Sequence, residues 1–194
     1  MKIICLTGNR RTGKDTIGNY LVKKYGYTKI AFADTLKEVC KLVFGFTDEQ
    51  VHGDEVKEKV DEYWRHSPRE ILQCVGTELF REKLPEVCCH IKDDIWIRSV
   101  ERKMLRLKKE EQKDKFVITD CRFQNEAQFV RSMSGEVCQL WKVVRGNNTD
   151  SHKSELYVNE IECDVLIDNN GEISELYQRC DSVLNMLSRH HIKT

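Results

Sequence analysis

The sequence predicts an α/β fold built on a five-stranded parallel sheet, and three observations support this. Short apolar runs, typical of strands buried on both faces, alternate along the chain with segments of helical apolar spacing. The chain has only two prolines, Pro68 and Pro85, and neither a repeat nor a low-complexity linker interrupts the alternation. Strands separated by helices pair in parallel through right-handed crossovers. We therefore expect one three-layer domain over residues 1–194.

The first half of the chain supplies two of the predicted strands. Residues 2–7 are almost entirely apolar, and residues 14–25 show a helical stripe that ends at Gly26. Residues 27–32 predict the second strand, and Asp34 is expected to cap a helix that extends to Phe44. Residues 47–66 are polar and predict short surface helices and loops. Ser67, Pro68 and Glu70 form the signature of a helix start, with a capping box.

The second half continues the alternation. A helix is expected over residues 91–109, a buried strand over 116–119 and a helix over 123–133. Residues 138–144 and 165–167 predict the last two strands. The turn residues 168–171 precede a final helix whose apolar positions run from Ile173 to Leu187.

Composition excludes several classes of protein. Lys plus Arg equals Asp plus Glu at 32 each, which argues against a chain whose main role is to coat nucleic acid or an anionic membrane. No apolar run approaches the roughly 20 residues of a transmembrane helix. The nine cysteines form no CxxC pair and indicate reduced thiols in the cytoplasm. The cluster from Cys88 to His90 lacks the second ligand pair that a zinc site requires.

The segment from Gly8 to Thr16, GNRRTGKDT, has the composition of a phosphate-binding loop. It lies between the first predicted strand and the first predicted helix, the context that such a loop requires. Its glycines allow backbone N–H groups to point at phosphate oxygens, the helix N-terminus adds partial positive charge, and Lys14 is expected to reach the terminal phosphates. Asp15 replaces the usual hydroxyl residue after the lysine. Either Thr16 or Asp15 would then lie near Mg²⁺.

Charged residues outside this loop suggest a second part of the site. Asp120 and Arg122 follow a buried strand, and ligands of open parallel sheets bind beyond such strand ends; the less favoured alternative is a surface ion pair or a cap for the helix that starts at Phe123. Phosphoryl transfer between two anions needs placed cations, and the candidates are Arg10, Arg11, Lys37, Arg69, Arg81, Arg122, Arg145 and Lys153. The polar loop over residues 145–153 has the composition of a lid, and a plain surface loop would fit that composition as well.

Seven segments occur in the order found in a known family: GNRRTGKDT (8–16), FADTLK (32–37), SPREILQCVGTELFRE (67–82), IWIRSV (95–100), VITDCRFQNEAQFVRSMSGEV (117–137), VVRGNNTDSHKSE (143–155) and DVLIDNNGEISELY (164–177). Through them the chain resembles the phage-type deoxynucleoside monophosphate kinases, a branch of the P-loop nucleoside monophosphate kinases. The resemblance implies a P-loop kinase fold, a helical acceptor-binding region over about residues 34–110 and a short lid over about 145–160. The chain is shorter than the phage enzymes between residues 45 and 66.

The resemblance also implies roles for individual positions. ATP would bind through Asn9, Arg10, Thr12, Gly13, Lys14, Asp15, Thr16 and Arg145, with Mg²⁺ near Asp15 or Thr16. The deoxynucleoside monophosphate would bind through Leu36, Lys37, Arg69, Gly76, Thr77, Trp96, Asp120, Arg122, Glu126 and His152. The residues expected to promote transfer are Lys14, Arg11, Arg69, Arg122 and Asp120.

The predicted reaction transfers the γ-phosphoryl group of ATP to a deoxynucleoside monophosphate in deoxynucleotide supply. Its acceptor phosphate has a second pKa of about 6, so the reaction needs no general base. The alternative is a P-loop kinase of another small phosphorylated metabolite such as phosphomevalonate. A switch GTPase is disfavoured because the chain has no NKxD motif, and neutral charge disfavours a nucleic-acid module. We expect small-molecule nucleotides as partners, no stable nucleic-acid or membrane binding, and a homodimer as the family implies. We also expect a cytoplasmic enzyme, which if virus-encoded would act in the host cytoplasm.

Overall fold

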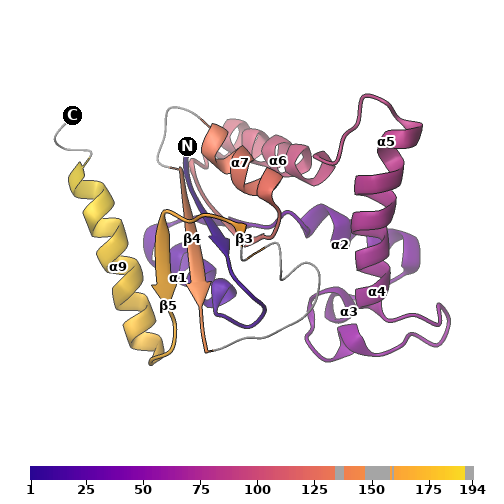
Figure 1. Cartoon of the computed structure of the whole chain (residues 1–194), viewed down its shortest axis with the longest axis horizontal. Helices are drawn as coiled ribbons and strands as arrows, with labels where there is room; N and C mark the ends of the chain where they lie inside the picture. The colour runs from indigo at the N-terminus through magenta and orange to yellow at the C-terminus, as the bar shows by residue number, and fades with distance from the viewer. Residues whose placement is uncertain (134–137, 147–157, 159, 191–194) are drawn as a thin grey trace. The chain divides into compact units, whose positions relative to one another are not determined.

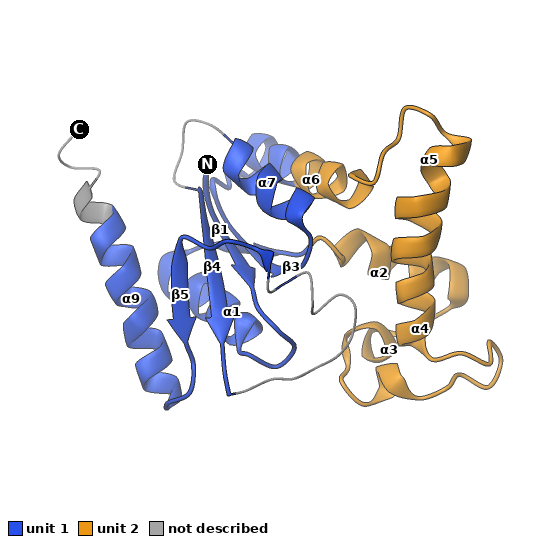
Figure 2. Cartoon of the chain, viewed as in Figure 1, with its two compact units in different colours: residues 1–31, 104–194 blue, residues 32–103 orange. Residues whose placement is uncertain are grey.

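The computed structural model describes residues 1–133, 138–146, 158 and 160–190. The chain forms two compact units (Figure 2), of which unit 1 comprises residues 1–31 and 104–194 and unit 2 comprises residues 32–103. Unit 2 overlaps the range expected for the acceptor-binding region. That this range binds the acceptor, and that the whole chain acts as one domain, stay predictions.

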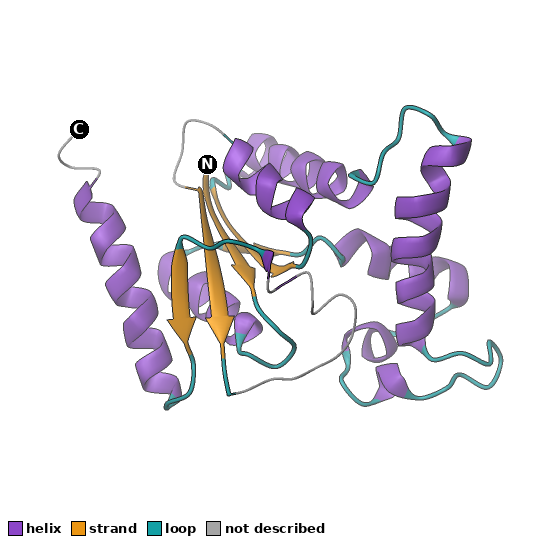
Figure 3. Cartoon of the chain, in the orientation of Figure 1, coloured by secondary structure: helices purple, strands orange, loops and turns teal. Residues whose placement is uncertain are grey.

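Unit 1 is built on a five-stranded parallel sheet (Figure 3), as the sequence predicts. The strands are β1 (Lys2–Thr7), β2 (Thr28–Ile30), β3 (Lys115–Cys121), β4 (Cys138–Val144) and β5 (Val165–Asp168). Their order in the sheet is β2-β3-β1-β4-β5, and every pair is parallel. β2 is shorter than the predicted range 27–32 because only Thr28 to Ile30 pair with β3 at this edge of the sheet.

Helices cover both faces of this sheet (Figure 1). Helices α1 (Lys14–Tyr25) and α9 (Ile173–His190) pack on one face. The strand residues of that core are Ile4, Leu6, Val117, Trp141, Val143 and Ile167. The alternate residues Ile3, Cys5 and Ile118 are fully buried too, because successive strand side chains point to opposite faces. Helix α7 (Gln124–Ser132) packs against β1 and β4. The three-layer α/β prediction is confirmed.

Unit 2 is helical. It contains α2 (Asp34–Phe44), α3 (Asp48–His52), η1 (Val56–Glu58), α4 (Pro68–Gln73), η2 (Cys74–Lys83), α5 (Leu84–Val87) and the first part of α6 (Ile95–Glu111). The capping box predicted at the start of α4 is confirmed, since Ser67 Oγ accepts from Glu70 N and Ser67 N donates to the Glu70 carboxylate at 2.7 Å. From Cys74 to Lys83 the helix has π geometry, which the apolar spacing of the sequence did not indicate.

Two local predictions about unit 2 are wrong. Asp34 does not cap α2, because Ala33 holds the cap position and the Asp34 carboxylate accepts from Lys103 Nζ at 2.8 Å. Helix α6 begins at Ile95 rather than at residue 91, because a turn at residues 93–94 precedes it; the Asp94 carboxylate of that turn accepts from Arg98 Nε, in the first turn of α6, at 2.8 Å. Within the described residues, no group of His, Cys, Asp and Glu side chains could bind a metal ion on its own, and no helix combines the length and apolarity that crossing a bilayer requires.

Candidate functional site

The loop between β1 and α1 leaves the sheet at Gly8. This residue has a φ of +139°, which L-residues rarely adopt, and a Cβ atom there would overlap the carbonyl oxygen of Val143 on β4. The loop therefore starts pressed against the neighbouring strand, where only glycine fits. Gly13 closes the loop with a φ of +104° at the cap position of α1. Both ends of the loop thus have a positive φ, the conformation for which glycine is suited.

Lys14 lies across this loop. Its ammonium donates to the carbonyl oxygens of Gly8 at 2.7 Å and Asn9 at 2.6 Å. The Thr12 hydroxyl donates to the same Asn9 carbonyl at 2.9 Å, and Thr12 is 2% exposed. The start of the loop is thus joined by hydrogen bonds to Thr12 and to the ammonium of Lys14, the first residue of α1. A helix N-terminus with free backbone donors and a lysine is a site that favours phosphate oxygens.

Asp15 and Thr16 face different neighbours. Asp15 Oδ1 forms an ion pair of 2.7 Å with Lys29 on β2, and the Asp15 side chain is 78% exposed. Thr16, one position further into α1, is half-buried. Both supply hard oxygen donors of the type that Mg²⁺ prefers, so the residues present fit a magnesium ion at the start of α1. Because the Asp15 carboxylate is paired with a lysine, the hydroxyl of Thr16 fits that role better.

Further candidate residues lie at the ends of neighbouring strands. Asp120 is the penultimate residue of β3, Arg122 follows that strand, and Arg145 follows β4 directly. Since β1, β3 and β4 are parallel neighbours, these residues lie at the carboxyl end of the sheet, as the phosphate-binding loop does. The Thr7 hydroxyl donates to the Cys121 carbonyl at 3.0 Å and joins the ends of β1 and β3. Arg11 is exposed and has a φ of +62°, an unusual conformation for a residue with a Cβ.

Glu126 has a structural role that the sequence did not indicate. It is 2% exposed, and its carboxylate accepts from the backbone N–H groups of Arg122 at 2.8 Å and Phe123 at 3.2 Å. This contact caps α7 and fixes the backbone on which Arg122 lies. A carboxylate at a helix N-terminus is stabilised by the free N–H groups there.

In unit 2, three of the predicted acceptor residues lie together. The Trp96 indole N–H donates to the Gly76 carbonyl at 2.9 Å, and a Cβ atom on Gly76 would overlap the Leu36 side chain. Trp96 is 5% exposed and packs on Phe80 with 5.2 Å between ring centroids. Thr77 follows on the π-helix η2 and is half-buried. Trp96 is therefore a core residue of unit 2 that fixes η2 at Gly76.

Two predicted cations of unit 2 have partners that sequence analysis missed. Arg69 Nε donates to Glu58 Oε1 at 2.5 Å, and Lys37 Nζ lies 3.1 Å from His52 Nδ1. Partial burial of the imidazole lowers the pKa of His52, and the Lys37 charge lowers it further, so the neutral ring can accept from the ammonium. Both partners lie in the segment from residue 47 to residue 66. The polar composition of this segment did not indicate that it pairs with Arg69 and Lys37.

Asn169 is a further residue that sequence analysis missed. It follows β5 and contacts the phosphate-binding loop, whereas the sequence marked it only as part of a turn. Its position after a buried strand was the available signal. His152, an expected acceptor residue, lies outside the described residues.

Comparison with known proteins agrees with this geometry. The model of the family described as deoxynucleotide monophosphate kinase matches residues 2–63 and 44–180. The chain belongs to this family. A protein of Acanthamoeba polyphaga mimivirus that is named as a deoxynucleotide monophosphate kinase is 33% identical over 192 residues, which cover 97% of this chain and 99% of that protein. The resemblance found in the sequence is thus confirmed.

Solved structures support the fold of this family member. A dephospho-CoA kinase from Campylobacter jejuni has a TM-score of 0.50 at 14% identity, covering 98% of this chain and all of that one. A sugar kinase from Janibacter sp. HTCC2649 has a TM-score of 0.51 at 12% identity, covering 95% of each chain. These likenesses show a kinase fold shared with enzymes of other names, and family membership makes the chain a kinase, that is, a phosphotransferase.

Proposed function

We propose that this family member transfers the γ-phosphoryl group of ATP to a deoxynucleoside 5′-monophosphate. An oxygen of the acceptor phosphate forms a bond to the γ-phosphorus, the bond from that phosphorus to the β–γ bridging oxygen breaks, and ADP leaves. The acceptor phosphate is largely dianionic at neutral pH, because its second pKa is about 6. The protein then has to align two anions and compensate their charge rather than remove a proton.

The observation that supports ATP binding most strongly is the arrangement of Lys14 over the loop that starts at Gly8. Its ammonium lies within hydrogen-bond distance of two loop carbonyls at the N-terminus of α1. We propose that bound phosphates replace these carbonyls as its partners. Along the loop, the remaining contacts to ATP would come from Asn9, Arg10, Arg11, Thr12, Gly13 and Thr16, with Arg145 after β4.

We propose acceptor-binding roles for residues of unit 2 and, separately, for residues of unit 1. In unit 2, Arg69 and Lys37 would contact its phosphate, while Leu36, Gly76, Thr77 and Trp96 would shape the surface that accepts the sugar and base. Because Trp96 and Leu36 are buried, they would act by fixing η2 rather than by contact. In unit 1, Asp120 and Arg122 would contribute, with Glu126 acting through the backbone of Arg122.

Mg²⁺ would bind near Thr16, with Asp15 as the second candidate. When bound, the ion neutralises charge on the ATP phosphates. The Asp15 carboxylate is already paired with Lys29, so we propose that the hydroxyl of Thr16 is the protein ligand. We further propose that the enzyme is cytoplasmic and acts on free nucleotides. We also propose that it is a homodimer, and sedimentation of the purified chain would test this oligomeric state.

An ADP-release assay over all deoxy- and ribonucleoside monophosphates, with phosphomevalonate included, tests this function. We expect ATP-dependent turnover with at least one deoxynucleoside monophosphate and none with phosphomevalonate. Turnover with phosphomevalonate alone would contradict the proposal and favour the alternative kinase. The Glu126→Gln variant serves as a probe of the acceptor side, because the amide oxygen can still accept from the backbone N–H groups of Arg122 and Phe123 while the buried charge is removed.

A further inference from the structure

The amide side chain of Asn169 lies against the phosphate-binding loop. Asn169 is 7% exposed, and its Nδ2 donates to the Thr12 carbonyl at 2.8 Å. Its backbone N–H donates to the Val144 carbonyl at the end of β4, also at 2.8 Å. The amide is therefore fixed by the sheet at one end and contacts the loop at the other.

The same amide defines the space beside Gly13. A Cβ atom on Gly13 would overlap Asn169 Nδ2, so the peptide that joins Thr12 to Gly13 passes directly over the amide. The chain contains no cis peptide bond among its described residues, and in a trans peptide the C=O and N–H groups point in opposite directions. With the Thr12 carbonyl directed at Asn169, the Gly13 N–H points away from it.

This arrangement selects one orientation of a peptide that could otherwise rotate. Glycine adopts positive and negative φ with similar ease, so the Thr12–Gly13 peptide has little intrinsic preference. A rotated peptide would present a carbonyl oxygen where an N–H group had been, and a carbonyl repels phosphate oxygens. It would also leave the Thr12 carbonyl without its buried partner.

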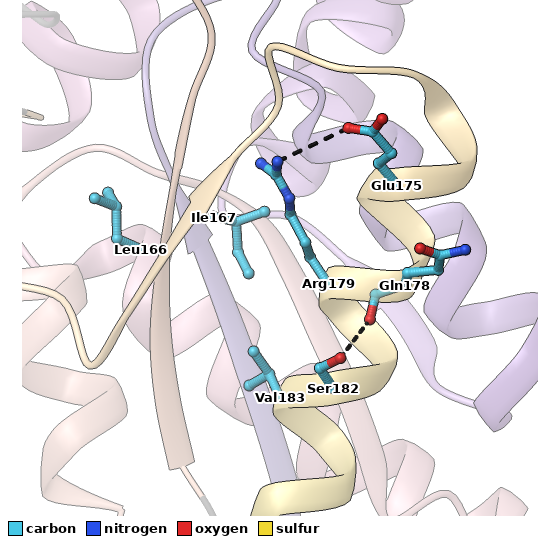
Figure 4. Close-up of a pocket in the computed structure, with 7 residues that line it drawn as sticks. All are labelled: Leu166, Ile167, Glu175, Gln178, Arg179, Ser182 and Val183. Atoms are coloured by element: carbon cyan, nitrogen blue, oxygen red, sulfur yellow. Dashed lines mark hydrogen bonds and ion pairs between the residues drawn. The ribbon is translucent and has the colours of Figure 1, made fainter.

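The turn that places Asn169 is itself fixed from α9. Asn170 N donates to Asp168 Oδ1 at 2.8 Å, and Arg179 forms an ion pair of 3.0 Å with the same carboxylate and also donates to the Asp168 carbonyl. Arg179 extends from α9 along the shallow groove beside β5 (Figure 4), where Glu175 lies 3.9 Å from its guanidinium. Arg179, paired with Glu175, thus fixes the turn from α9.

We infer that Asn169 is a positioning residue for ATP: its amide holds the Thr12–Gly13 peptide with the Gly13 N–H free to bind a phosphate oxygen. The inference rests on the proposed function of the loop and adds a residue to it. It predicts that loss of the amide donor weakens ATP binding while acceptor binding stays unchanged.

The test compares Asn169→Asp with Asn185→Asp in the full chain. Asn169→Asp keeps the shape of the side chain but places an oxygen where the donor was. Asn185 is exposed on α9, so Asn185→Asp introduces the same charge away from the loop. Calorimetry with MgATP and steady-state kinetics with a deoxynucleoside monophosphate are measured on both. A net loss of stability would lower kcat by reducing the folded fraction, but would leave both KM values unchanged.

We expect Asn169→Asp to raise the Kd and the KM for ATP about tenfold or more, with the acceptor KM within about twofold and Asn185→Asp indistinguishable from wild type. If Asn169→Asp does not fold, Asn169→Ala removes the donor without adding charge and is expected to give the same split. A folded variant at Asn169 whose Kd for ATP stays within about twofold overturns the inference. A wild-type chain that binds no ATP would overturn the proposed function instead, which keeps the two failures distinct.

Discussion

Replacing Gly8 by alanine tests the packing of the phosphate-binding loop against the sheet. Two costs apply at this position. A Cβ at a φ of +139° costs about 1–3 kcal/mol. The same atom would overlap the Val143 carbonyl oxygen, a backbone atom of the central sheet that cannot rotate away, and such overpacking costs about 1–3 kcal/mol. We therefore expect Gly8→Ala to lower the free energy of unfolding by about 2–6 kcal/mol, a large part of the stability of a typical domain.

Gly26→Ala is the matched control, because Gly26 has a φ of +70° and no atom within 4 Å of the added Cβ. It incurs only the dihedral cost, about 1–2 kcal/mol. Urea unfolding of the three proteins gives both values. Activity separates them as well: a loop shifted by about 1 Å loses about 100-fold in rate, so Gly8→Ala should be nearly inactive and Gly26→Ala active. Equal stability and activity in the two variants would refute the steric argument.

Three further variants test other contacts. Asp181→Ala removes a carboxylate that accepts hydrogen bonds from three side chains of α1, those of Tyr20, Lys24 and Tyr25. Burial works to raise the pKa of Asp181, yet these bonds lower it, so the carboxylate stabilises the fold above its unfolded pKa of about 3.9 and this stabilisation is lost as pH falls through the lower folded pKa. We expect Asp181→Ala to lower the free energy of unfolding by about 1–3 kcal/mol at pH 7 and by less in acid, as measured by thermal unfolding. A loss that does not depend on pH would contradict this. Trp96→Phe removes the indole N–H that donates to the Gly76 carbonyl and should cost about 0.5–1.5 kcal/mol in urea unfolding, whereas a neutral effect would show that η2 is fixed otherwise. Glu58→Ala removes the carboxylate that holds the Arg69 guanidinium, so the acceptor would have to order this side chain on binding, and the acceptor KM should rise about 3- to 10-fold. Glu58→Gln can still accept from Arg69 Nε and should keep the wild-type KM. Equal KM values in all three proteins would show that Arg69 does not contact the acceptor.

Features that depend on neighbouring residues could be predicted from the sequence. The capping box at Ser67 and the phosphate-binding loop both consist of residues a few positions apart, so their chemistry is legible in one short segment. The alternation of strands and helices likewise gave the sheet and its layers. The prediction that Asp34 caps α2 was wrong because a lysine of α6 competes for the same carboxylate.

Contacts between distant segments could not be predicted. Asn169 and Thr12 are 157 positions apart, and a polar turn residue gives no sign of its partner. The sequence implied a monophosphate-binding role for Trp96, and gave no sign that its indole donates to the carbonyl of Gly76, 20 positions away. The same holds for Glu58, whose pairing with Arg69 depends on how η1 and α4 pack within unit 2.

The most direct test of the account is the activity of Lys14→Ala beside that of Lys23→Ala, measured as ADP release with ATP and a deoxynucleoside monophosphate. Lys23 is an exposed lysine in the last turn of α1 and serves as the control for loss of one positive charge. If Lys14 compensates charge on the transferred phosphoryl group, its loss should lower kcat/KM by about 1,000-fold or more, with the fold retained and Lys23→Ala at the wild-type rate. A folded Lys14→Ala protein within about tenfold of the wild-type rate, less than 1.4 kcal/mol in the barrier, would contradict a phosphate-binding role for this loop.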